Sequence, residues 1–152
     1  MTSTRYVRPA GADRAFNSAV RWLTEHGVSL AGSRVLTVAG RRSGLPRSTP
    51  VNLLEHGDHR YLVSPRGETE WVRNARAAGG AAQLSVGRRV EHVVLAEVPV
   101  ADRPPVLRVY LERWGWEVGR FVEGLTKDAS EADLAAAAPG FPVFVVTGGT
   151  GV

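Results

Sequence analysis

The chain has 152 residues, a length typical of a single domain, and its content of 43% hydrophobic and 22% charged residues is that of an ordinary globular protein. It contains no cysteine, which excludes disulfide scaffolds, thiolate metal sites, iron–sulfur clusters and a cysteine nucleophile. No stretch approaches the roughly 18 apolar residues of a transmembrane helix. We therefore expect one domain over residues 1–152, located in the cytoplasm, whose redox chemistry would require a bound cofactor.

The positive charge is concentrated in one part of the sequence. The formal net charge is +4, and the window from Arg34 to Arg47 holds four arginines and no acidic residue. A focused cluster favours one anionic ligand of limited size, whereas nucleic-acid binders more often spread cations along a face or helix. We therefore expect a small anionic partner and no nucleic acid.

The first predicted element is an amphipathic helix over residues 12–26, with apolar side chains at helical spacing and Gly27 as a stop. We expect this helix to pack on the core. An alternative reading is peripheral contact with a membrane or a lipid-like quinone.

The central third predicts a meander of strands. A β-branched run over 34–39 and an alternating run over 48–54 form a hairpin, and the turn at residues 56–59 leads into a third strand over 60–64. Residues 68–78 lack a strand pattern and predict a short helix ending at Gly79 and Gly80.

The remaining elements complete a mixed fold. Residues 83–86 and 88–98 predict a second hairpin, 106–122 and 130–138 predict helices, 142–147 predict a last strand, and 148–152 predict a frayed tail. Five or six mostly antiparallel strands with flanking helices indicate an α+β protein with a small closed or split β-barrel.

The residues that can carry chemistry cluster in the central third. Glycines allow backbone amides to turn towards an anion, a hydroxyl adds a donor, and arginines make bidentate contacts to phosphate. The phosphate-loop and dinucleotide-binding glycine motifs are both absent. Four segments supply the candidate residues: Gly40 to Gly44, Pro50 to Asn52, Ser64 to Gly67, and Trp71 with Asn74 and Arg76.

These segments, in this order, resemble a known family. The run from Val35 to Arg47 (VLTVAGRRSGLPR), followed by Pro50, Arg66-Gly67 and Trp71-x-x-Asn74, is similar to the deazaflavin (F420)-dependent nitroreductases. That family has a split β-barrel, related in fold to FMN-binding pyridoxamine-phosphate oxidases. The close match covers residues 34–78, and the strand at 142–144 resembles the family's last strand.

The resemblance implies that reduced coenzyme F420 donates a hydride to a quinone, a nitroaromatic compound or an activated alkene. It assigns the phosphate and acidic tail of the cofactor to the basic hairpin, the deazaflavin ring to backbone contacts along the second strand, and support of the cofactor to the segments that follow. The implied cofactor-binding residues are Arg41, Arg42, Ser43, Gly44, Arg47, Pro50, Val51, Asn52, Ser64, Arg66, Gly67, Trp71, Asn74 and Arg76.

A catalytic side chain is not required, because the cofactor supplies the hydride chemistry and the protein supplies orientation and a dry pocket. Tyr110 is the candidate proton donor. At their helical spacing, Tyr110, Trp114, Trp116 and Phe121 are either core residues or the wall of an aromatic pocket.

Two further readings of the function stay open. The chain could be an FMN-dependent reductase on the same barrel, or a non-catalytic module that binds a flavin or tetrapyrrole. We expect no metal site, since the histidines lack matching ligands. The sequence does not fix the oligomeric state.

Overall fold

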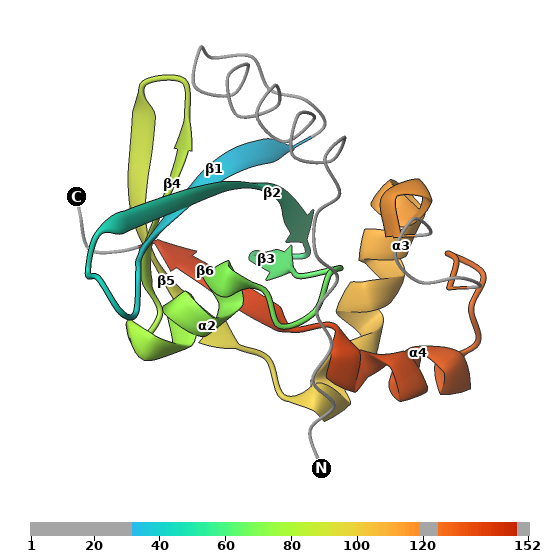
Figure 1. Ribbon diagram of the computed structural model, residues 1–152. Coiled ribbons are helices and arrows are strands. Elements are labelled where there is room, and N and C mark those ends of the chain that lie inside the picture. Colours follow the sequence, from blue (N-terminus) through green and yellow to red (C-terminus); the bar gives the residue numbers. More distant parts are fainter. Residues whose placement is uncertain (1–31, 119–124, 149–152) are drawn as a thin grey trace.

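The computed structural model describes residues 32–118 and 125–148, and the side chains as far as Gly115 and from Leu125 on. In this part the chain forms six strands, three α-helices and two short 3₁₀ helices (Figure 1). The strands are β1 (Ser33–Ala39), β2 (Pro46–His56), β3 (His59–Val63), β4 (Ala81–Val86), β5 (Arg89–Glu97) and β6 (Val143–Gly148). The helices are α2 (Glu70–Ala77), η1 (Val100–Asp102), α3 (Pro104–Val118), α4 (Glu131–Ala137) and η2 (Ala138–Gly140).

The six strands form a closed antiparallel barrel in the order β1-β2-β3-β6-β5-β4. The two predicted hairpins are present, with Val38 opposite Arg47 in the first and Val86 opposite Arg89 in the second. Closure depends on three pairings between segments distant in sequence: β1 with β4, β3 with β6, and β5 with β6. The predicted barrel with flanking helices is confirmed, and strands β2, β4 and β6 each extend beyond the predicted ranges.

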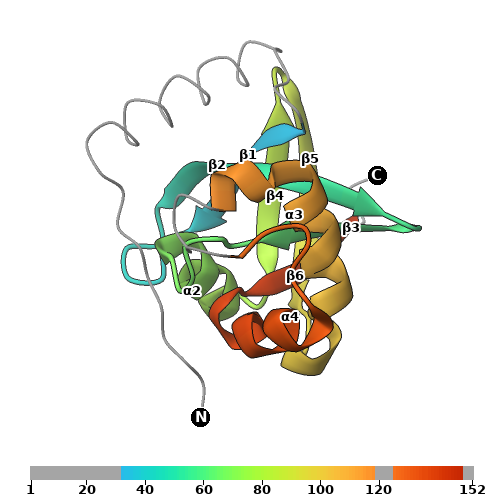
Figure 2. The same cartoon turned by 90° about the vertical axis from the view of Figure 1, so that its right-hand side faces the viewer.

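Alternation along the strands separates the buried residues into two clusters. One fills the barrel and includes Leu36, Leu53, Leu62 and Leu84. The other includes Leu54 and lies between the outer face of the barrel and α3. Figures 1 and 2 show α3 and α4 together on one side of the barrel, away from α2.

Helix α2 covers one end of the barrel with Val72 and Ala75, which pack on the interior cluster. The chain then passes directly into β4 through Gly80, which has a φ of 90°. A Cβ at this position would lie 2.2 Å from the carbonyl oxygen of Leu95, so only glycine allows this close approach of β4 to β5.

The two C-terminal helices follow the predicted positions with one difference. Helix α3 has a non-helical residue, Trp114, with φ −129° and ψ 27°. Helix α4 begins as predicted at Ser130, whose side chain accepts a hydrogen bond of 3.0 Å from the backbone N–H of Asp133.

Three sequence-based expectations fall on residues that the structure does not describe. These are the helix over 12–26 with its membrane alternative, the end of the predicted 106–122 helix, and residues 149–152 of the tail. Gly148, predicted to lie in the tail, ends β6. None of the described helices is long and apolar enough to cross a membrane.

Candidate functional site

The β1–β2 hairpin tip, residues 40–45, is held by its own backbone. Gly40 donates to the carbonyl of Leu45 and Gly44 donates to the carbonyl of Gly40, each at 2.8 Å. Gly44 has a φ of 75°, which favours glycine. The hydroxyl of Ser43 accepts a hydrogen bond from the backbone N–H of Leu45 at 3.1 Å. The tip therefore has a defined shape before any ligand binds.

Arg41 connects the tip to α2 through hydrogen bonds and an ion pair. Its backbone N–H and its guanidinium donate to the same oxygen, Oδ1 of Asn74, at 3.0 and 2.9 Å. The guanidinium also pairs with Glu70 at 3.1 Å. The structure thus brings together two predicted cofactor residues, Arg41 and Asn74, but it joins them to each other.

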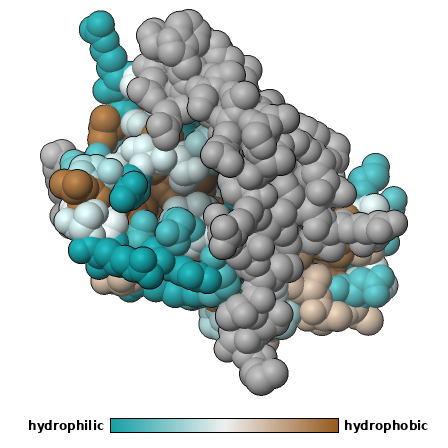
Figure 3. Space-filling model, in the orientation of Figure 1, coloured by the Kyte–Doolittle hydropathy of each residue, from teal (hydrophilic) through white to brown (hydrophobic). Residues whose placement is uncertain are grey.

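Besides Arg41, the cations here are Arg42 in the tip and Arg47 two residues beyond it in β2. Both are exposed, and neither side chain makes a hydrogen bond or ion pair with another described residue. Figure 3 shows hydrophilic side chains gathered at the lower left of the molecule, where Figure 1 has the tip and α2. Arg42 and Arg47 are therefore the two tip arginines best placed to meet an anion.

The expectation of one four-arginine cluster between Arg34 and Arg47 is wrong. Arg34 lies near the start of β1, at the other end of the barrel from the tip. An extended strand rises about 3.3 Å per residue, so Arg34 is about 17 Å from Ala39, where the tip begins. The local charge at the tip is reduced further because Arg41 pairs with Glu70.

The outer face of β2 leads from the tip towards α3. Val51 and Leu53 point into the barrel, so alternation places Pro50 and Asn52 on the outside, followed by Leu54 beneath α3. The strand from Pro46 to Leu54 spans about 26 Å. Pro50 and Asn52 are half-buried side chains on this face, whereas Val51 can reach it only through its backbone.

The loop from β3 to α2 uses its polar groups internally. Ser64 is fully buried, and its hydroxyl donates to the carbonyl of Gly67 at 2.6 Å. Gly67 has a φ of 85°, and its carbonyl also accepts from the backbone N–H of Thr69 at 2.8 Å. Arg66 is half-buried beside this turn. The hydroxyl of Ser64 therefore shapes the loop, and its predicted contact with a cofactor remains a prediction.

The other α2 residues have structural partners. The ring of Trp71 packs on that of Phe144, with the ring centres 5.5 Å apart. Arg76 pairs with Glu68 at 2.5 Å and with Glu97 at 2.7 Å, and Arg103 pairs with the same Glu97 at 3.0 Å. These charge-assisted hydrogen bonds raise the pKa of Arg76 and lower that of Glu97. Arg76 therefore connects α2 to the end of β5.

Tyr110 lies in the cluster between the barrel and α3. It is 2% exposed, and its ring centre is 5.0 Å from that of Trp114. Both views place α3 on the opposite side from the tip (Figures 1 and 2). Of the two readings left open for the aromatic residues, this packing favours the core for Tyr110 and Trp114. The side chains of Trp116 and Phe121 lie outside the described part.

Sequence reasoning missed the acidic partners of these arginines. Glu70 precedes Trp71 by one residue, and Glu68 and Glu97 flank α2 and β5. Glu68 lies in the same predicted helix as Arg76, whereas Glu70 is 29 residues from Arg41 and Glu97 is 21 residues from Arg76. Only the long-range topology reveals the pairs with Glu70 and Glu97.

Comparison with known proteins identifies a matching family. The family model of the F420H(2)-dependent quinone reductases matches residues 14–115, more than half of the chain. No curated protein is significantly similar in sequence.

Several solved structures share the fold at low sequence identity. One, named an F420-H2 dependent reductase (FDR-A), is 19% identical with a TM-score of 0.50, covering 76% of this chain and 94% of its own. A second, named a domain-swapped dimer, is 17% identical with a TM-score of 0.54, covering 91% and 100%. A third, a FAD-binding protein from Mesorhizobium loti, is 16% identical with a TM-score of 0.51, covering 90% and 89%.

The match to the family model covers the hairpin tip, the β3–α2 loop, α2 and most of α3. It agrees with the resemblance to F420-dependent enzymes seen in the tip sequence and in Trp71-x-x-Asn74. The family that matches is that of the quinone reductases. The chain belongs to the F420H(2)-dependent quinone reductase family, whose members are oxidoreductases.

Proposed function

We propose that this chain binds reduced F420 along the outer face of β2 and transfers a hydride from it to a quinone. The observation that carries the proposal is the exposed pair Arg42 and Arg47, at the end of a strand whose outer face continues to α3. A long anionic cofactor needs cations at one end and a flat, less polar surface for its ring. The hairpin tip provides the cations, and the outer face of β2 that follows it provides the surface for the ring.

The described residues fit such a cofactor chemically. Guanidinium groups bind phosphate and carboxylate through paired, charge-assisted hydrogen bonds. Arg42 and Arg47 have no competing carboxylate partner among the described residues. Gly44 leaves space for close approach, since a Cβ there would meet nothing within 4 Å, and Ser43 adds an exposed hydroxyl. About 26 Å of strand, from Pro46 to Leu54, is enough for an elongated molecule to lie extended.

When bound, reduced F420 supplies the hydride, and the protein orients cofactor and acceptor. In our proposal Arg42, Ser43 and Arg47 bind the anionic end, and Arg41 positions the tip through Asn74. Pro50 and Asn52 border the ring, with the backbone of Val51 between them. Arg66 and Gly67 are assigned to the cofactor side, near the start of α2.

The hydride delivers two electrons and one hydrogen to the acceptor. A quinone then needs one further proton to become a hydroquinone. We assign a quinone as acceptor because the matched family reduces quinones, and nitroaromatic compounds and activated alkenes as secondary candidates. Proton donation by Tyr110 would require its hydroxyl to reach the acceptor from a buried position. Water is the alternative proton source.

The experiment is a fluorescence titration of the purified protein with F420 and, in parallel, with FMN. Saturable binding of F420 and weak binding of FMN support the proposal. The reverse result identifies an FMN-dependent reductase. Oxidation of F420H2 upon addition of menadione, measured with and without protein, then separates an enzyme from a module that only binds a flavin or tetrapyrrole.

A further inference from the structure

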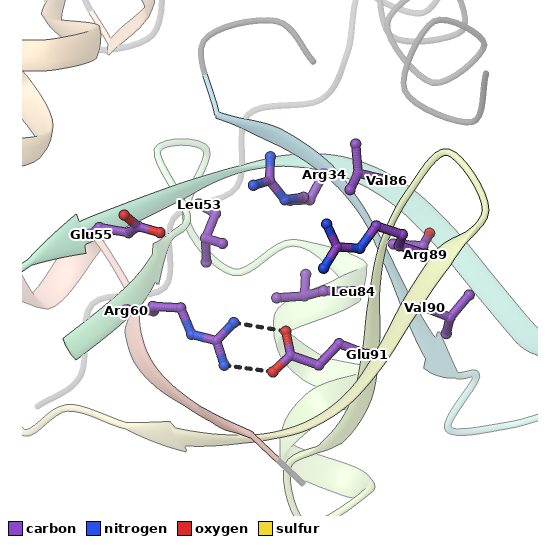
Figure 4. A pocket seen from close by; sticks show the side chains of 10 residues that line it. Arg34, Leu53, Glu55, Arg60, Leu84, Val86, Arg89, Val90 and Glu91 are labelled. Carbon is purple, nitrogen blue, oxygen red and sulfur yellow. Dashed lines mark hydrogen bonds and ion pairs between the residues drawn. The ribbon is translucent and has the colours of Figure 1, made fainter. Parts of the chain in front are cut away.

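The barrel end opposite α2 contains a cavity of about 410 Å³. Strands β1 to β5 all contribute to its lining (Figure 4). We call this cavity the barrel mouth. β1 runs from the mouth to the hairpin tip, so about 17 Å of strand separates Arg34 at the mouth from the tip. The mouth nevertheless adjoins the far end of β2, since Arg34 lies opposite Val51 and Leu53 lines the cavity.

The floor of the barrel mouth is apolar. Leu53 and Leu84 are 6% and 3% exposed, and Val86 and Val90 line the cavity above them. The rest of the lining is polar or charged. The volume lies within the range of about 300 to 1,000 Å³ that is typical of sites for small organic molecules.

The rim carries a fixed ion pair. Arg60 donates to both oxygens of Glu91, at 2.7 and 2.8 Å. Gly148 lies against this pair, since a Cβ there would be 3.3 Å from Oε2 of Glu91. Glu55 lies opposite Arg60 in the β2–β3 ladder. The hydrogen bonds that Arg60 donates to Glu91, together with the charges of Glu91 and Glu55, raise the pKa of Arg60. The two rim carboxylates therefore both act on Arg60.

Arg89 is the cation that these carboxylates do not neutralise. Its side chain makes no hydrogen bond or ion pair with any other described residue. Figure 4 shows its guanidinium directed into the barrel mouth above Leu84, with Arg34 on the same side of the cavity. The rim thus holds three arginines and two glutamates, which leaves one positive charge over an apolar floor.

We infer that the barrel mouth binds a small organic acid, with its carboxylate on Arg89 and its apolar body on Leu53 and Leu84. A carboxylate matches the paired N–H donors of a guanidinium. Arg60 is already paired with Glu91 and is not available to a second anionic group. The ligand therefore carries a single anionic group. The ligand lies inside the barrel mouth, whereas the proposed cofactor lies on the outer face of β2, so the two sites use opposite faces of the same strand. The inference does not depend on the proposed function.

The test is calorimetric titration of the full chain, without cofactor and at low salt, with 1-naphthoate and with uncharged 1-naphthamide. We expect saturable binding of the naphthoate and binding of the amide weaker by about tenfold or more, the difference that a hydrogen bond to a charged group makes. Arg89→Ala should weaken naphthoate binding by a similar factor. Equal binding of acid and amide would overturn the inference.

Arg88 provides the matched control, because it is exposed in the β4–β5 turn and does not line the cavity. Arg88→Ala should change naphthoate affinity by less than about twofold, since it alters only screened surface charge. An equal loss in both variants would mean general charge attraction and would contradict a site at Arg89. Displacement of naphthoate by F420 would contradict a separate site.

Discussion

Oδ1 of Asn74 accepts two hydrogen bonds from Arg41, one from its backbone and one from its guanidinium, across 33 positions of sequence. Asn74 is 4% exposed, so this oxygen is a buried acceptor at the junction of the hairpin tip and α2. The conformation of the tip therefore depends on a side chain from another element.

Replacement of Asn74 should loosen the tip. In Asn74→Ala the Arg41 donors lose their acceptor, and we expect the free energy of unfolding to fall by about 1–3 kcal/mol in urea denaturation. F420 affinity should fall as well, because Arg42 and Ser43 lose their fixed placement. Arg73→Ala on the same helix is the control, since Arg73 is exposed, and its effect should stay within about 0.5 kcal/mol. Equal stability of the two variants would show that the contact is unimportant.

The double variant Arg42→Ala/Arg47→Ala should weaken F420 binding strongly at low salt and much less at high salt. The reason is that exposed charge pairs are screened within about 10 Å at 0.1 M salt. Fluorescence titration at two salt concentrations measures the difference, with Arg88→Ala as the control for net charge. Unchanged affinity at low salt would remove the tip from the cofactor site.

The ion pairs of Glu97 should make stability depend on pH. Hydrogen bonding and attraction to Arg76, with a further contribution from Arg103, lower the pKa of Glu97 below its ordinary value of 4.5. A lowered folded-state pKa stabilises the fold above pH 4.5, and this contribution is lost as the pH falls through the folded-state value. Glu97→Gln should therefore be less stable than the parent at neutral pH, and the difference should shrink in acid.

Thermal unfolding from neutral pH to pH 3 measures this effect. Glu112→Gln is the matched control, because Glu112 is exposed and makes no ion pair with a described residue. A difference between parent and Glu97→Gln that stays constant with pH would contradict the linkage.

Tyr110→Phe tests the proposed proton donor. The ring is buried against Trp114, so we expect the variant to fold and to keep most of its kcat with menadione, with water supplying the proton. A general acid contributes about 10²-fold or more to the rate. A loss of that size, with unchanged F420 affinity, would assign the role to Tyr110.

The local elements of this fold could be predicted from the sequence. Strand alternation, the glycines at the turns and the Ser130 cap gave both hairpins, α2 and α4 close to their observed bounds. These signals arise from near neighbours in the chain. The closing pairs β1–β4, β3–β6 and β5–β6 join distant segments, and only the general expectation of a barrel anticipated them.

The candidate site was less predictable, because arginines that are close in the sequence can lie far apart in the fold or be paired with carboxylates. Arg34 and Arg47 lie 13 positions apart, yet the length of β1 takes Arg34 to the barrel mouth. Arg41 and Arg76 are counted as cations in the sequence, but Glu70 pairs with Arg41, and Glu68 and Glu97 pair with Arg76. Composition could not distinguish paired arginines from those available to a ligand.

Closure of the barrel limits how copies of this protein can associate. Each of the six described strands has a neighbour on both sides, but the registers are staggered, so residues 46–52 of β2 pair with β1 alone and residues 53–56 with β3 alone. Addition of a strand from another molecule is a common route to assembly and to fibrils, and it needs an unpaired edge. Among the described strands such an addition is therefore limited to short stretches of this kind, and other association uses side chains on the outer faces or an exchange of whole segments between two copies.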